Sequence, residues 1–116
     1  MRRMSRSHAL LRRLRLAALA TAWLWPAAAW AASGADCLRF GLIARTMQAD
    51  YLAGRSFQQA RQDGLNLLGP EHPRQALIVE QLARGIYTSP DSRGVSAQAR
   101  ALQVQAECLQ AAAQAH

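Results

Sequence analysis

The side chains beyond residue 31 whose types most often react or bind metals are two cysteines and two histidines: Cys37, Cys108, His72 and His116. A zinc site needs about four such ligands at close spacing, and a thiol redox site is usually C-x-x-C. Neither spacing occurs in this sequence. His72 lies in the proline-flanked segment GPEHP, where a solvated turn residue is expected. The sequence therefore predicts no metal site and no cofactor.

The acidic and hydroxyl side chains form no catalytic motif. Asp50 and Asp63 could meet across two neighbouring helices, but the sequence does not determine their separation. The serines beyond residue 88 lack the G-x-S-x-G context of a nucleophile elbow, and there is no glycine-rich phosphate loop. Tyr51 and Tyr87 fall near expected helix ends, where a phenol packs its ring and satisfies its hydroxyl. We therefore expect a protein that is not an enzyme.

The first 31 residues have the three parts of a secretory signal peptide. Six arginines and no acid precede an uncharged, mostly apolar run over residues 16–25, which Pro26 ends. Ala29 and Ala31 then supply the small residues of an A-x-A cleavage site. We predict a signal peptide over residues 1–31, cleaved between Ala31 and Ala32. The alternative is an uncleaved membrane anchor over residues 16–35, which its alanine-rich composition and Pro26 disfavour.

Removal of that segment changes the charge of the chain. The whole sequence has a formal net charge of +7, with 14 arginines and no lysine. Six arginines lie before the cut, so 14 − 6 = 8 remain against seven acids, a net of +1. A strongly basic protein would suggest a nucleic-acid partner, and this inference fails for residues 32–116. We expect these residues to form a single small domain.

An exported chain meets an oxidising compartment, where paired thiols form disulfides. Cys37 and Cys108 allow one intramolecular pairing, which closes a loop of roughly 70 residues. The chain-entropy model assigns such a loop about 4 kcal/mol. A lipid anchor on Cys37 is disfavoured because Asp36, not a small residue, precedes it. The sequence therefore predicts a Cys37–Cys108 disulfide in a periplasmic or secreted protein.

Glycines and prolines divide the remaining chain into four segments with helical periodicity and no strand-like alternation. The expected helices cover residues 36–53, 56–68, 73–87 and 96–113. Asp36 is the expected N-cap of the first, Ser56 begins the second, and Pro73 lies in the first turn of the third. Because both cysteines fall on apolar stripes, the start of the first helix should lie beside the end of the fourth. The fold class is all-α, a small four-helix bundle closed by one disulfide and preceded by a signal peptide.

The period also assigns inner and outer side chains. The inner faces are expected to contain these residues: Cys37, Phe40, Ala44, Met47 and Tyr51; Phe57, Ala60, Gly64, Leu67 and Leu68; Ile78, Val79, Leu82, Ala83 and Ile86; Ala97, Ala101, Val104, Cys108 and Ala111. Arg100, Gln103 and Glu107 are expected on the outer face of the fourth helix. Glu80 and Arg84 have the spacing of a surface ion pair.

The layout resembles that of small exported helical proteins of proteobacteria. The resemblance depends on Cys37 near the expected mature start, GRSFQQA after the first helix, IYTSP after the third, and Cys108 near the end. In architecture the chain also resembles HdeA-type periplasmic acid-stress chaperones, which are small, helical and linked by one disulfide. Its cysteines are spaced more widely. These resemblances imply export and one disulfide.

The functional prediction is an exported protein with a non-enzymatic role, which binds a protein or stabilises an envelope component. The alternatives are an HdeA-like stress chaperone, and a membrane-anchored helical protein with an uncleaved N-terminal helix. A small hydrolase, or an inhibitor of one, would have to use the loop containing Glu71 and His72. An unidentified protein is the candidate partner, and no nucleic-acid partner is expected. Membrane contact is expected only through residues 1–31, and the oligomeric state stays open.

Overall fold

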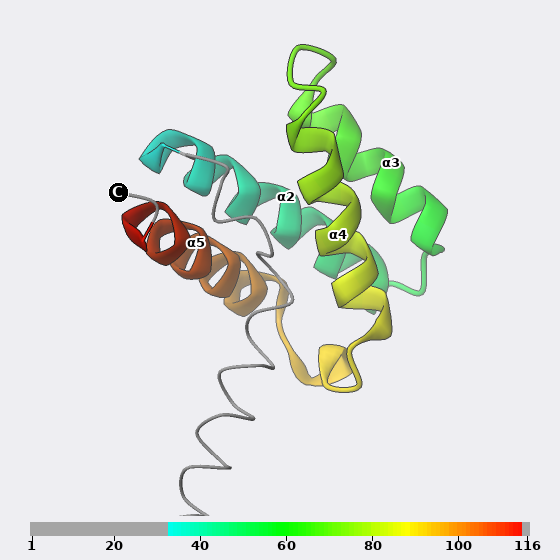
Figure 1. Ribbon diagram of the computed structural model, residues 1–116. Coiled ribbons are helices and arrows are strands. Elements are labelled where there is room, and N and C mark those ends of the chain that lie inside the picture. The colour runs from blue at the N-terminus through cyan, green and yellow to red at the C-terminus, as the bar shows by residue number, and fades with distance from the viewer. Residues whose placement is uncertain (1–32, 115–116) are drawn as a thin grey trace, which may run out of the picture.

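The structure is a computed structural model that describes residues 33–114 (Figure 1). The described part contains four α-helices, one short 3-10 helix and no strand: α2 (Gly34–Leu52), α3 (Phe57–Leu68), α4 (Gln75–Thr88), η1 (Ser92–Gly94) and α5 (Ala97–Gln114). This confirms the prediction of an all-α helical bundle. The predicted signal peptide, and its cleavage site between Ala31 and Ala32, lie outside the described residues.

Helix α2 lies at the centre of the fold and packs against the other three α-helices (Figure 1). Helix α5 runs antiparallel to it on one side, and the α3–α4 hairpin covers another side. Among the described helices, α5 packs closely on α2 alone. A single disulfide between Cys37 and Cys108 joins the start of α2 to the end of α5, with the two Cα atoms 5.4 Å apart. The predicted pairing is confirmed, and its sulfur atoms are buried within the helix pair.

The first helix begins earlier than the sequence analysis predicted. Its N-cap is Ser33, and Asp36 is the third residue of the helix. The Ser33 hydroxyl accepts a hydrogen bond from the Asp36 backbone N–H at 3.2 Å, while the Asp36 carboxylate accepts one from the Ser33 N–H at 3.1 Å. The prediction that Asp36 is the N-cap was wrong because this reciprocal capping box satisfies two free backbone donors at once. The same backbone hydrogen bond lowers the pKa of Asp36 below its ordinary value.

The third predicted helix also starts at a different place. Pro73 lies in the preceding turn rather than in the first helical turn, and α4 begins at Gln75. The backbone carbonyl of His72 accepts from the N–H groups of both Gln75 and Ala76, which completes the turn into the helix. In contrast, Ser56 caps α3 as predicted, and its hydroxyl accepts from the backbone N–H three residues later at 3.1 Å.

The core lies where α2 meets its neighbours, and the broad apolar face predicted for α4 is buried throughout. Two assignments of the sequence analysis were wrong. Leu67 was placed on the inner face of α3, yet it is 53% exposed because α3 buries the stripe of Ala60, Gly64 and Leu68. Arg100 was placed on the outer face of α5, yet it is 2% exposed because buried hydrogen-bond acceptors receive its guanidinium.

Gly64 sets how closely α3 approaches the core. A Cβ at this position would lie 2.8 Å from Met47 Sδ and 2.9 Å from Val79 Cγ1. No larger side chain fits without displacing these neighbours, since the interior is close-packed. The absence of a side chain at Gly64 therefore allows α2, α3 and α4 to meet at one point.

Candidate functional site

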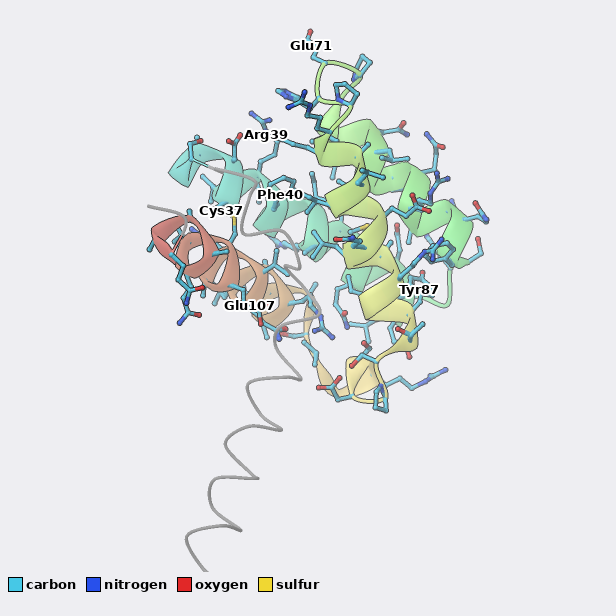
Figure 2. All side chains as sticks on the ribbon, in the orientation of Figure 1. Cys37, Arg39, Phe40, Glu71, Tyr87 and Glu107 are labelled. Carbon is cyan, nitrogen blue, oxygen red and sulfur yellow. A yellow bond between two sulfur atoms is a disulfide. The ribbon has the colours of Figure 1, made fainter. Side chains whose placement is uncertain are left out.

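The loop between α3 and α4 does not assemble a catalytic group. His72 is half-buried, and its Nε2 atom lies 3.3 Å from Nη1 of Arg39. Arg39 in turn lies 3.8 Å from a carboxylate oxygen of Asp36. Glu71 stands exposed at the tip of the loop (Figure 2). His72 lines a shallow hollow of about 370 Å³ together with apolar and amide residues, but an arginine, not a nucleophile or carboxylate, is its hydrogen-bond partner.

Residues 33–114 contain no group of three or more His, Cys, Asp or Glu side chains placed to hold a metal ion. Within the same range, none of the helices combines the length and the apolar character required to cross a bilayer.

Asp50 and Asp63, which the sequence analysis suggested as neighbours, do meet between α2 and α3. Arg55 lies between them, with Nη1 3.5 Å from Asp50 Oδ1 and 3.8 Å from Asp63 Oδ2. Asp50 is 6% exposed, and its Oδ2 atom has no hydrogen-bond partner in the described chain. Burial raises the pKa of Asp50 to about 6, and the neighbouring Asp63 carboxylate adds to the rise while Arg55 opposes it. The Asp50 carboxyl therefore changes its charge near pH 6.

An aromatic cluster lies beside the acidic pair. The Tyr87 hydroxyl donates to the backbone carbonyl of Arg55 at 2.8 Å, and the ring contacts Tyr51 edge-on with centroids 5.1 Å apart. Phe57 packs edge-on at 5.7 Å from the other side. Burial, with a smaller contribution from Asp50, raises the pKa of Tyr87 above its ordinary value. The prediction of a core aromatic with a satisfied hydroxyl is confirmed for Tyr87, which anchors the α2–α3 turn.

A buried polar network, which the sequence analysis missed, connects α2, η1 and α5. Arg100 donates from Nε to Gln48 Oε1 at 3.0 Å and from Nη2 to Ser92 Oγ at 3.1 Å. Gln48 donates to the backbone carbonyls of Ser92 and Val95 at 2.7 and 2.9 Å, and the Ser92 hydroxyl donates to the carbonyl of Ile86. Both Gln48 and Ser92 are fully buried. The network satisfies the backbone of the α4–α5 connection, so its role is structural.

One sequence signal could have revealed this network. Arg100 lies four residues before Val104 and eight before Cys108, so it belongs to the stripe that faces α2. On the same side, Arg100 donates to Gln103 at 2.8 Å, and Gln103 lies 3.5 Å from Glu107. Burial raises the pKa of the Glu107 carboxyl. The polar residue types led to an outward assignment, although their spacing indicated the inner side.

The surface of the α2–α5 pair exposes several leucines. We define the leucine face as Leu38, Leu42 and Arg45 of α2 together with Leu102 and Leu109 of α5. The leucines are between 45% and 57% exposed. A hollow of about 130 Å³ lies between the two helices, lined by residues that include Leu38, Arg45 and Leu102. Its floor is close-packed, because a Cβ on Gly41 would lie 3.0 Å from the Ala101 carbonyl oxygen.

A second hollow continues the leucine face toward α3. It has a volume of about 450 Å³ and is lined by Leu42, Arg45, Thr46, Ala49, Asp50 and Leu67. Leu42 and Arg45 belong to both hollows, so the two hollows adjoin across α2, one toward α5 and the other toward α3. The sequence analysis did not identify this surface. Its signal is the spacing of Leu38 and Leu42, and of Leu102 and Leu109, which repeat at helical intervals away from the inner stripes.

The chain was compared with protein-family models, curated proteins and solved structures, and no significant match was found in any of the three.

Proposed function

We propose that the protein is exported to the periplasm or secreted, and that it acts there as a small non-enzymatic domain that binds a protein partner. The leucine face is the observation on which the binding role depends. The signal-like pattern of residues 1–31 supports export, and the Cys37–Cys108 disulfide fits an oxidising compartment.

Single exposed leucines are common on soluble proteins, but contiguous apolar patches mark interaction sites. Here the exposed leucines of two helices border a common hollow, and Leu67 of α3 extends the surface. Each square ångström of apolar surface removed from water stabilises a complex by about 25 cal/mol before the costs of association. A partner that covers these leucines would therefore gain more binding free energy than a partner that covers an equal area of charged surface.

The polar clusters support a non-enzymatic role. Arg100 and Gln48 are occupied in holding the α4–α5 connection, and Tyr87 holds the turn after α2. Arg55 occupies the space between Asp50 and Asp63. These polar side chains therefore make their hydrogen bonds and ion pairs within the domain, where they stabilise its turns and connections.

An HdeA-like stress chaperone is the second candidate, because exposed leucines also suit the capture of unfolded clients. It predicts that the purified protein suppresses the aggregation of a denatured client at low pH. Light scattering that is unchanged by the protein from pH 2 to pH 7 would exclude this candidate. A membrane-anchored form differs from both because it would retain residues 1–31 after export.

A photoreactive amino acid in the leucine face tests the binding role in the native cells. Leu102 and Leu77 are each 57% exposed, and Leu77 lies on α4 outside the leucine face. We expect a photoreactive residue at position 102 to crosslink to a discrete protein in the envelope or secreted fraction, and one at position 77 to give no such product. Equal crosslinking from both positions, no crosslink from 102, or a chain confined to the cytoplasm would contradict the proposal.

A further inference from the structure

Arg45 gives the leucine face its charge. It is exposed in the middle of α2 and lines both hollows, between Leu42 on one side and Ala49 on the other. Within residues 33–114 it makes no ion pair, whereas Arg39, Arg55, Arg61 and Arg84 each lie within 4 Å of a carboxylate. An exposed guanidinium surrounded by apolar side chains is available to a carboxylate from outside the domain.

No carboxylate of the described chain lines the α2–α5 hollow, whose polar side chains are Arg45, Gln98 and Gln105. The α2–α3 hollow has one, Asp50, but this group is buried and lies 3.5 Å from Arg55. The accessible charge on the leucine face is therefore positive. A complementary surface must provide apolar side chains together with an acid.

We propose that the leucine face binds an amphipathic helix of a partner protein, whose apolar side chains cover Leu38, Leu42 and Leu102 and whose Asp or Glu pairs with Arg45. The inference rests on the proposed binding role and adds the chemistry of the partner. Two antiparallel helices at close approach leave a groove along their line of contact, into which a third helix packs. The axial rise from Leu38 to Arg45 is about 10 Å, so a partner helix of about two turns or more covers them.

The positive charge of the leucine face disfavours two other binding partners, a second copy of the chain and a membrane surface. In a symmetric dimer the same patch supplies both sides of the contact, so Arg45 of one copy would find no carboxylate in the α2–α5 hollow of the other. A membrane surface attracts clusters of several cations, whereas the leucine face has a single arginine in the described chain. An acidic amphipathic helix satisfies both the leucines and the guanidinium.

Two synthetic helical peptides provide the test, with identical leucine positions and either Glu or Lys at the flanking positions. Their affinities for the exported, disulfide-intact protein are measured by fluorescence anisotropy at low and physiological salt. We expect the Glu peptide to bind at least tenfold more tightly than the Lys peptide. Arg45→Glu should reverse this preference, and Arg74→Glu, an equal charge change at an exposed position outside the face, should leave it unchanged. Leu102→Gln should weaken both peptides at least tenfold, whereas Leu77→Gln should not.

Equal affinity for the two peptides, no binding of either, or an Arg45→Glu protein that keeps the original preference would overturn the proposal. So would a dimer in sedimentation that Leu102→Gln dissociates, because a second copy would then occupy the face. Binding to vesicles containing anionic phosphatidylglycerol that Arg45→Glu abolishes would assign the face to lipid and also overturn it. If position 102 still crosslinks to a protein in cells, only the partner chemistry is wrong; loss of the crosslink removes the binding role itself.

Discussion

Replacing Asp50 with Asn is expected to stabilise the fold at neutral pH and to remove most of the pH dependence that this residue causes. The pKa of the folded-state carboxyl is raised from 3.8 to about 6, first by burial and then by Asp63. At 1.36 kcal/mol for each pH unit, this difference corresponds to about 3 kcal/mol. Because the folded state holds the proton more tightly, the contribution is complete below pH 4 and is lost as the pH rises through 6.

The assay is urea unfolding of the oxidised domain, followed by circular dichroism from pH 4 to pH 8. The free energy of unfolding of Asp50→Asn should match that of the unchanged protein near pH 4 and exceed it by up to about 3 kcal/mol near pH 7.5. Asp63→Asn serves as the partner variant, since it removes the neighbouring carboxylate but keeps Asp50. Asp63→Asn should lower the pKa of Asp50, so that the loss of stability occurs at lower pH and is smaller than in the unchanged protein.

Two results would contradict a net burial cost at Asp50. One is an Asp50→Asn protein that is less stable than the unchanged protein at pH 7.5, which would mean that the ion pair with Arg55 outweighs the cost of burial. The other is an unchanged difference between the two proteins across the whole pH range. Comparison with the variant is essential because half-buried Glu107, whose pKa is raised by desolvation, contributes in the same direction. Asp36, with its lowered pKa, contributes in the opposite direction.

Three further predictions concern stability and are checked by the same unfolding assay at pH 7. Gly64→Ala should destabilise the fold by about 1–3 kcal/mol because the new Cβ would lie 2.8 Å from Met47 Sδ, whereas Gly34→Ala meets no atom within 4 Å and should not. Arg100→Met should lower the free energy of unfolding by about 1–3 kcal/mol because it leaves Gln48 Oε1 buried without its donor. An unchanged urea midpoint would contradict the structural role of the buried polar network. Reduction of the disulfide should lower the free energy of unfolding by about 4 kcal/mol. Identical unfolding curves for the oxidised and the reduced protein would show that the disulfide does not stabilise the fold.

Local patterns were sufficient to predict the helices and their order. Each helix repeats apolar residues at three- and four-residue spacings, and breakers such as Gly54 and Gly69 separate them, both with positive φ values that favour glycine. The Cys37–Cys108 pairing followed because two cysteines allow a single pairing and both lie on apolar stripes. Helix ends were less predictable, because the capping box at Ser33 competes with Asp36 as the N-cap.

The candidate site depends on tertiary placement and could not be predicted in the same way. The spacing of Arg100 places it on the inner stripe of α5, but its acceptor on Gln48, 52 residues away in the chain, becomes its neighbour only in the folded chain. Leu67 is outside because α3 covers α2 with one narrow stripe only. The leucine face requires α2 and α5 to lie side by side, so its residues become neighbours only after the chain has folded.

The intact mass of the protein recovered from the envelope or secreted fraction shows whether the chain is exported, cleaved and closed by its disulfide. We expect a chain that begins at Ala32 and carries two hydrogens fewer than its reduced form, because Cys37 and Cys108 are joined. Reduction should restore exactly this difference of two hydrogens. A chain that retains residues 1–31, or one that carries two free thiols after alkylation without reduction, would contradict it.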